Sequence, residues 1–282
     1  MRDPRIAELE DVAARAVAAV AGDEPVSAAV PMFLLRHYLA TDAPALGEAL
    51  GLALAQALAL AGGETSVIGR AEWLTLLVEA TAVADDERIV PAVVELVAAL
   101  RATWAAGTRV DEGSASVDAC LRAASLLDRR ELVQDAIDHL ERVVGGSYRP
   151  GDGLILTRGG IHQRGSFDDH VRGASALLTA FEITGRLPYS MLAEELMAIA
   201  GREPSPDADL AIACEAARVL CRLAALHDDP EYRGAAVIAT GADYRAQASR
   251  ILAAQSARAR AGTPSAAAAY GLALRDLLGN VR

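Results

Sequence analysis

The chain has 282 residues, of which 52% are hydrophobic and only 4% aromatic, and its formal net charge is −11. The apolar fraction is enough for a sizeable core, and alanine-rich, aromatic-poor composition favours packed helices over β-sandwiches or barrels. All 27 basic residues are arginines, which excludes chemistry that needs a lysine, and an acidic chain without a basic stripe is not expected to bind nucleic acid.

The cysteines and the N-terminal segment indicate a reducing compartment. Cys120, Cys214 and Cys221 are odd in number and show neither a CxxC pair nor the spacing of zinc ligands, so we expect free thiols, a cytoplasmic location and no metal. Residues 1–17 are charged and amphipathic, unlike a secretory leader. The longest apolar run, residues 46–61, is interrupted by two polar residues, and we interpret it as a buried helix rather than a membrane span.

Apolar residues recur at helical spacing along the whole chain. Cutting this pattern at clusters of glycine, proline and aspartate predicts about twelve helices. In chain order they cover residues 5–21, 26–40, 43–61, 66–83, 86–104, 115–127, 129–144, 168–184, 187–200, 207–227, 240–260 and 264–279.

Several of these segments have residues suited to helix ends. Short oxygen-bearing side chains can accept the unpaired N–H groups of a first helical turn, and glycine tolerates the left-handed conformation after a last turn. The predicted N-terminal caps include Ser114, Asp168 and Thr263, and the predicted stops include Gly185 and Gly201.

The predicted helices alternate in character. The second, fourth, sixth, eighth, tenth and twelfth are apolar over most of their circumference, whereas the first, fifth, seventh, ninth and eleventh carry charged faces. A helix that is apolar nearly all round is enclosed, and one with a charged stripe lies outside. The sequence therefore predicts an all-α (α/α)6 toroid that forms a single domain over residues 1–282, with an open solenoid of helical hairpins as the alternative.

Three sequence blocks in the second half resemble a known family. They are LVQDAIDHLERVV leading into GSFDDHVRGASALLTAFEITG, then PSPDADLAIACEAARVLCRLAAL followed by DPEYR or ADYRAQASRIL, and last TPSAAAAYGLALRDLLG. They are similar to the helical domain of the thioredoxin-domain-containing family of unknown function, within the six-hairpin glycosidase and N-acylglucosamine 2-epimerase fold group. The resemblance covers about half of the chain and implies the toroid fold.

The chain also departs from that family. The sequence has no thioredoxin module or CxxC motif, and the family's tyrosine after Asp-Asp is His170 here. The family's asparagine in a Pro-Ser-Gly-Asn block is replaced by Asp207 or Asp209. The sugar chemistry that the resemblance implies is therefore an expectation to be tested.

The densest group of chemically capable side chains lies in the Gly-rich stretch 145–172, which we expect to be a functional loop at the mouth of the toroid. Asp169 and His170 are the predicted proton-transfer pair, since a carboxylate beside a histidine suits acid–base chemistry. His162 is a second candidate catalytic histidine. The alternative is that the aspartates only cap a helix and that the loop is a mobile surface flap.

Other residues are candidates for holding a substrate. Arginines near these histidines suit an anionic group, and first-turn residues of inner helices are expected at the same mouth, where Glu72 and Trp73 also fall. The predicted substrate-binding residues are Arg158, Arg164, Asp168, Arg172, Trp73, Asp209 and Tyr270.

Two functional hypotheses follow. The first is a cofactor-independent enzyme, or a subunit of one, that uses acid–base chemistry on a polar or anionic metabolite: epimerisation, elimination or ring closure with an anionic leaving group. Specialised-metabolite biosynthesis is the setting we expect for it. The second is a non-catalytic partner subunit that stabilises or caps an active homologue in a hetero-oligomer. Both require a small molecule or a protein as partner, and neither requires nucleic acid or a membrane.

Overall fold

The structure is a computed structural model that describes residues 3–22, 26–105, 109–158, 161–202, 208–236 and 241–279. Within these ranges the chain forms thirteen α-helices: α1 (Pro4–Val20), α2 (Ala29–Thr41), α3 (Pro44–Ala61), α4 (Val67–Ala80), α5 (Ile89–Ala102), α6 (Val110–Leu126), α7 (Arg130–Leu140), α8 (Phe167–Thr184), α9 (Leu187–Ala200), α10 (Leu210–Asp228), α11 (Pro230–Ala236), α12 (Tyr244–Ala261) and α13 (Pro264–Gly279). A 3-10 turn (Thr103–Ala105) follows α5, and a π-helical turn (Glu141–Gly145) follows α7.

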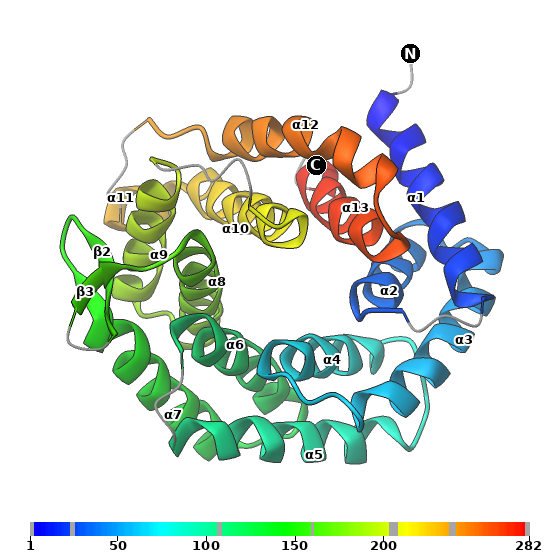
Figure 1. Ribbon diagram of the computed structural model, residues 1–282, viewed down its shortest axis with the longest axis horizontal. Coiled ribbons are helices and arrows are strands. Elements are labelled where there is room, and N and C mark those ends of the chain that lie inside the picture. Colours follow the sequence, from blue (N-terminus) through cyan, green and yellow to red (C-terminus); the bar gives the residue numbers. More distant parts are fainter. Residues whose placement is uncertain are drawn as a thin grey trace.

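The helices form two concentric rings. Figure 1 shows α2, α4, α6, α8, α10 and α13 around the centre, with α1, α3, α5, α7, α9 and α12 outside them. The first helix packs on the last, α13, so that the ring closes. This is the (α/α)6 toroid that the alternation of apolar and charged helices predicted, rather than the open solenoid.

Burial follows the ring that each helix occupies. The inner helix α8 buries residues around most of its circumference, from Asp169 to Ala180. The outer helix α12 buries only Tyr244, Ala248, Leu252 and Ala259, on one face, and presents its arginines to solvent. Small side chains allow close packing of the inner helices, and at Gly271 of α13 an added Cβ would lie 2.6 Å from Cε2 of Phe33 in α2.

Some predicted helix boundaries are wrong. Helix α6 begins at Val110, so Ser114 lies inside the helix and is fully buried instead of capping it. Helix α8 is capped by Ser166, not Asp168: the Ser166 hydroxyl accepts the Asp169 N–H, and the Asp169 carboxylate accepts the Ser166 N–H. This capping box satisfies two helix-end donors reciprocally, which a single aspartate cannot do. The short helix α11 was not predicted as a separate element.

Helix α3 is less buried than the sequence suggested. It is long and apolar enough to cross a membrane by length and composition, and 39% of its residues are buried. Helix α3 lies in the outer ring and packs on α1 beside it and on the inner helix α2, as Figure 1 shows. Leu52, on its outer face, is 59% exposed. The prediction of a buried helix therefore holds for only one face of α3.

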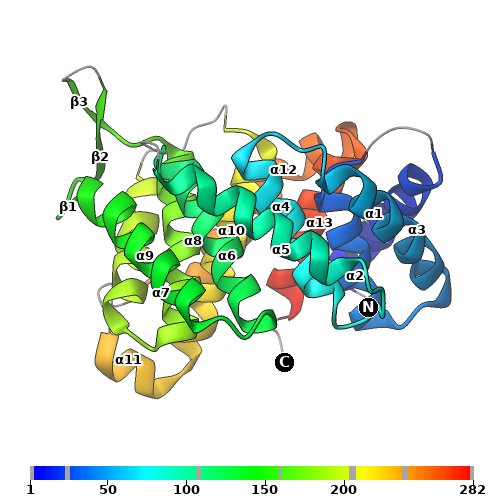
Figure 2. The same cartoon turned by 90° about the horizontal axis from the view of Figure 1, so that it is seen from below.

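The Gly-rich stretch forms a small antiparallel sheet instead of a loop. Strands β1 (Tyr148–Arg149), β2 (Gly153–Arg158) and β3 (Ile161–Arg164) lie in the order β1-β2-β3, with Ile155 opposite Arg164. Figure 2 shows this hairpin projecting beyond the helical rings. Gly153 has φ +80°, and a Cβ there would lie 2.6 Å from Nε2 of His170, so the start of β2 requires glycine on both counts.

Candidate functional site

A cavity of about 420 Å³ lies at the centre of the toroid, where the N-terminal turns of the inner helices meet. Residues from α2, α4, α6, α8, α10 and α13 line it, together with segments that precede α2, α10 and α13. The chemistry of its wall is balanced between four arginines and four carboxylates: Arg36, Arg122, Arg172, Arg218, Glu72, Asp118, Asp209 and Glu215.

Small residues keep this space open. Seven alanines line the cavity, and they come from the first turns or approaches of several inner helices: Ala28, Ala29, Ala71, Ala115, Ala211, Ala266 and Ala269. An alanine side chain cannot fill the axis of a ring of six helices. The alanine-rich composition therefore provides both the helix-forming tendency and the pocket.

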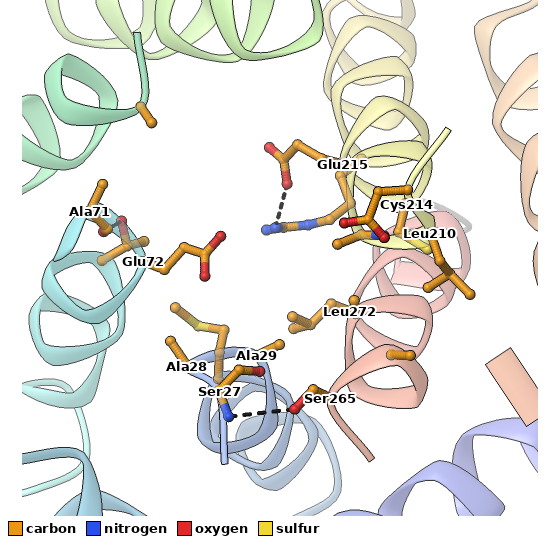
Figure 3. Close-up of a pocket in the computed structure, with 18 of the residues that line it drawn as sticks. Ser27, Ala28, Ala29, Ala71, Glu72, Leu210, Cys214, Glu215, Ser265 and Leu272 are labelled. Atoms are coloured by element: carbon orange, nitrogen blue, oxygen red, sulfur yellow. Dashed lines mark hydrogen bonds and ion pairs between the residues drawn. The ribbon is translucent and has the colours of Figure 1, made fainter. Parts of the chain in front are cut away.

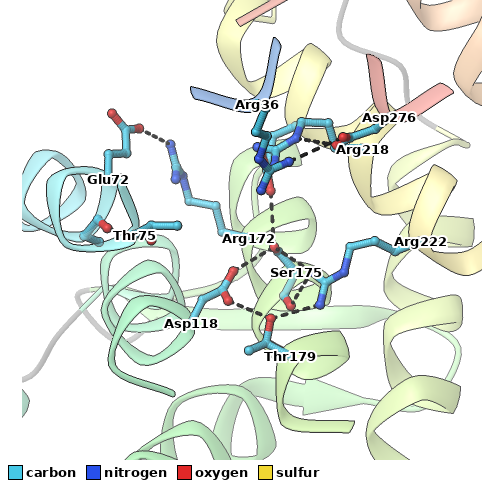
Figure 4. A network of polar contacts seen from close by, with 12 residues as sticks. Arg36, Glu72, Thr75, Asp118, Arg172, Ser175, Thr179, Arg218, Arg222 and Asp276 are labelled. Atoms are coloured by element: carbon cyan, nitrogen blue, oxygen red, sulfur yellow. Dashed lines mark hydrogen bonds and ion pairs between the residues drawn. The ribbon is translucent and has the colours of Figure 1, made fainter. Parts of the chain in front are cut away.

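The floor of the pocket on the α6 and α8 side is a network around Asp118 (Figure 4). Oδ1 of Asp118 accepts hydrogen bonds from the Thr179 hydroxyl at 2.6 Å and from Nε of Arg122 at 2.9 Å. Arg222 donates to Thr179 at 2.9 Å. Burial alone would raise the pKa of Asp118, but the charges of Arg122 and Arg222 outweigh it and lower that pKa to about 2.

A second network closes the floor between α2, α4, α10 and α13. Arg218 donates to Oδ2 of Asp276 at 2.8 Å and to Oε2 of Glu215 at 2.9 Å. Arg36 binds Glu79 with two hydrogen bonds, at 2.9 and 2.6 Å. Burial would raise the pKa of Glu79, but its hydrogen bonds and charge interaction with Arg36 hold the pKa below the ordinary value. The arginines of the floor are therefore committed to carboxylates of the chain itself.

Arg172, at the mouth, differs from the other pocket arginines. Its Nη2 lies 4.0 Å from Oε1 of Glu72, and its Nε is buried without a hydrogen-bond partner among the described residues. The Glu72 side chain is 49% exposed, and its partial desolvation at the pocket wall raises its pKa, partly opposed by Arg172 and reinforced by Glu215. Burial also raises the pKa of Asp168, again opposed by Arg172. The pKa values of Glu72 and Asp168, the two carboxyl groups that interact with Arg172, are thus both raised.

Of the predicted substrate-binding residues, Arg172 and Asp209 line this pocket. Asp209 caps α10, where its carboxylate accepts the Ala211 N–H at 3.4 Å. Asp168 lies at the start of α8, one turn from Arg172, and interacts electrostatically with Arg172 and Asp209. The structure therefore brings these three predicted residues together at one mouth.

The predicted catalytic pair lies outside the pocket wall. Asp169 is 2% exposed, and its carboxylate accepts hydrogen bonds from the Ser166 and Asp111 N–H groups. His170 is also 2% exposed; its Nε2 accepts the Leu154 N–H at 3.2 Å and its Nδ1 faces the Ser166 carbonyl at 2.8 Å. These contacts fit a neutral imidazole that donates from Nδ1. In the structure His170 fastens β2 to α8, Asp169 caps α8 and joins it to α6, and neither residue borders the cavity.

The hairpin residues also stand apart from the cavity. His162 and Arg164 are exposed on β3, and Arg164 lies 4.0 Å from Asp152. Arg158 ends β2, and its side chain falls outside the described part of the structure. The described residues of the hairpin contribute nothing to the lining of the pocket, although the loop was expected to cover it.

Two other predicted ligand contacts are structural. Trp73 is 5% exposed, belongs to the hydrophobic core and does not line the cavity. Tyr270 donates its hydroxyl proton to Glu8 at 2.8 Å and borders a separate hollow between α1, α12 and α13. The structure therefore does not bring Trp73 or Tyr270 to the wall of the central pocket, where the sequence placed them.

The sequence reasoning missed several residues that do line the pocket. Glu72 was placed at the mouth but was passed over as a ligand in favour of its neighbour Trp73, and Glu215 and Arg218 were not considered. A charged pair three residues apart on an otherwise apolar helix was the available signal, because a charge on an enclosed helix needs a cavity or a partner. No group of three or more potential metal ligands occurs among the residues that the structure describes.

The fold and this pocket define the chain as an (α/α)6 toroid of the six-hairpin glycosidase fold, with a polar pocket at the N-terminal ends of the inner helices. No family model matches the sequence, and no curated protein matches it. Solved structures match the fold throughout. An unsaturated glucuronyl hydrolase specific for heparin superposes with a TM-score of 0.70 at 13% identity, over 96% of this chain and 97% of its own.

Two further structures agree. The unsaturated glucuronyl hydrolase of Bacillus sp. GL1, responsible for the degradation of glycosaminoglycan, has a TM-score of 0.65 at 13% identity, covering 89% of this chain and 85% of its own. An inactive variant of the α-1,6-mannanase of Salegentibacter sp. HEL1_6, in complex with α-1,6-mannotetrose, has a TM-score of 0.66 at 10% identity, over 89% and 87% of the two chains. At these identities the similarity establishes the fold.

Proposed function

We propose that the chain is a cofactor-independent acid–base enzyme that acts on a polar, anionic polyhydroxyl metabolite in the central pocket. The observation that carries this proposal is the arrangement at the mouth, where Arg172 has an unpartnered Nε and lies beside Glu72, whose pKa is raised by burial. A carboxyl group that keeps its proton at higher pH suits a general acid, and a guanidinium with spare donors suits an anionic group.

The roles of the side chains follow from their positions. Arg172 holds the anionic group of the compound, and Glu72 on α4 supplies a proton to an oxygen of the same molecule. Glu215 reaches the pocket from α10, facing α4 across the cavity, where Arg218 holds it (Figure 3). With a proton donor and a carboxylate on facing walls, the pocket can give a proton to one side of a bound sugar ring and take one from the other side. Epimerisation, elimination, ring closure with an anionic leaving group and cleavage at a sugar ring are reactions of this type.

The comparisons support the substrate class. The solved structures of similar fold include hydrolases whose names specify glucuronyl groups and a mannanase bound to a mannose oligomer. A pocket of about 420 Å³ has the size of small-molecule sites. The described cysteines are buried free thiols, which supports a cytoplasmic setting as part of the proposal.

The binding test uses sugar pairs that differ in charge. We expect glucuronate to raise the melting temperature of the protein more than glucose, and Arg172→Gln to abolish this difference. Compounds that bind are then tested for turnover by wild type and by Glu72→Gln, with Glu95→Gln on the exposed face of α5 as the matched control. Equal stabilisation by both sugars, or full turnover by Glu72→Gln, would contradict the proposal.

The alternative function, a non-catalytic partner subunit, makes a different prediction. The native mass after co-expression with the products of neighbouring genes would then be that of a hetero-oligomer, and the isolated chain would turn over none of the compounds it binds. A homogeneous monomer or homodimer that is active by itself would exclude this alternative.

A further inference from the structure

One hydroxyl group lies beneath the pocket, between two of its carboxylates. Ser175 on α8 is 4% exposed and does not line the cavity. Its Oγ lies 2.9 Å from Oδ2 of Asp118 on α6 and 3.2 Å from Oε1 of Glu215 on α10. Three successive inner helices therefore meet at a single serine oxygen.

This hydroxyl can serve only one of the two carboxylates at a time. A serine has one hydroxyl proton to donate. Arg222 donates to Oγ of Ser175 at 3.3 Å and also to its carbonyl at 3.2 Å, so a lone pair of the oxygen is already occupied by a donor (Figure 4). The proton is thereby directed towards Asp118 or Glu215.

The two carboxylates depend unequally on Ser175. Asp118 is held as an anion by Thr179 and Arg122 through its other oxygen, Oδ1. Glu215 is held by Arg218 through Oε2, and among the described residues Ser175 donates the hydrogen bond to its other oxygen, Oε1. When the hydroxyl turns to Asp118, Oε1 of Glu215 is left without this donor and faces the cavity.

We propose that Ser175 is a positioning residue that makes Glu215 the proton acceptor of the pocket. This inference rests on the proposed function. The bond from a proton to an oxygen or carbon of the bound compound breaks, and an O–H bond forms on Oε1 of Glu215 while the hydroxyl of Ser175 is turned to Asp118. Glu72 supplies a proton from the opposite wall, so the compound gains one proton and loses one. Ser175 acts only through Glu215 and does not touch the compound.

The first test needs no substrate. The side-chain carboxyl carbon of Glu215 is followed by ¹³C NMR against pH, with the signal assigned through Glu215→Gln. We expect Ser175→Ala to raise the measured pKa of Glu215 by about 0.5 to 1 unit, because the ionised form loses a hydrogen bond. Ser175→Thr, which keeps the hydroxyl, should restore the wild-type midpoint. The matched control is Ser190→Ala, because Ser190 is also buried and its hydroxyl donates to a backbone carbonyl. This substitution should leave the midpoint of Glu215 unchanged.

A midpoint for Glu215 that moves by less than roughly 0.2 pKa unit in Ser175→Ala would overturn the inference. If Ser175→Ala does not fold, Ser175→Cys replaces it, since a thiol is a weaker donor and should raise the midpoint in the same direction. A midpoint in Ser175→Cys equal to that of wild type would overturn the inference equally.

The second test separates this inference from the proposed function. With a compound that wild type turns over, Ser175→Ala should move the acidic limb of the kcat/KM profile to higher pH by the same amount as the NMR midpoint, so that kcat falls only at acidic pH and KM changes little. If the NMR midpoint moves but no compound is converted, the proposed function fails while the control of Glu215 by Ser175 stands. If a compound is converted and neither the midpoint nor the limb moves, only the role of Ser175 fails.

Discussion

Replacing Asp118 by asparagine tests the energetics of the pocket floor. The pKa of Asp118 is about 2 in the folded chain, compared with 3.8 for an ordinary aspartate. At about 1.4 kcal/mol per pKa unit, its ionised form stabilises the fold by about 2 to 3 kcal/mol at neutral pH. The substitution also leaves Arg122 without its ion-pair partner, and removing one partner of a buried ion pair costs about 3 to 5 kcal/mol. We therefore expect Asp118→Asn to lower the free energy of unfolding by about 3 kcal/mol or more.

Urea unfolding at pH 7, followed by far-ultraviolet circular dichroism, measures this loss. The matched control is Asp135→Asn in the pair between Arg101 and Asp135, where both side chains are 43% exposed. An exposed pair contributes at most about 1 kcal/mol. A loss in Asp118→Asn no larger than in the control would refute the reasoning from burial.

The pH dependence gives the same prediction a second measurement. A carboxylate whose folded pKa is lowered stabilises the fold fully above its unfolded pKa, here 3.8, and the contribution is lost as the pH falls to about 2. Wild type should therefore lose more stability between these pH values than Asp118→Asn does. Parallel stability curves for the two proteins in this range would show that Asp118 is not the group responsible.

Three other substitutions test the core and the hairpin. Burial lowers the pKa of His139 to about 4, so wild type should lose stability as the pH falls from the ordinary histidine value of 6.5 towards 4, and His139→Gln should flatten that decline in thermal melts. Gly271→Ala places a Cβ 2.6 Å from Phe33 and should cost about 1 to 3 kcal/mol in urea unfolding; an unchanged midpoint would mean that α2 and α13 separate easily. Gly153→Ala is strained at φ +80° and displaces His170, so the hairpin should become sensitive to limited proteolysis while the helical circular dichroism remains.

The fold could be predicted from the sequence because the two patterns that indicate it, helical periodicity and the alternation of enclosed and one-sided helices, are local. Helical periodicity and the difference between enclosed and one-sided helices, such as α8 and α12, can be read along the chain without knowledge of contacts. Helix ends were less predictable. Ser166 and Asp169 cap α8 by a reciprocal pair of hydrogen bonds, and this depends on a chain direction that is set by the sheet before the helix.

The site was predicted only in part, because membership of a pocket depends on which side of a helix faces the axis. Glu72 and Trp73 are neighbours on α4, yet their side chains differ in direction by about 100°. If the face of the helix that points to the axis is assigned one residue out, a core residue is taken for a pocket residue. Asp169 and His170 combine the residue types of a catalytic pair, but Asp169 accepts backbone N–H groups of the α8 N-cap and of α6, and His170 accepts one from β2. Arg172 and Asp209 were predicted correctly as neighbours of the mouth, since each lies in or just before the first turns of an inner helix.

The closure of the ring also has consequences for the synthesis of the chain. Arg15 of α1 donates to the carbonyls of Ala259, Arg260 and Gly262, and Glu8 accepts from Tyr270. Helix α1 is translated before α12 and α13, so it finds these partners only after those helices have been made. Until then its apolar face has no neighbour from α12 or α13, and this delay exposes the nascent chain to aggregation.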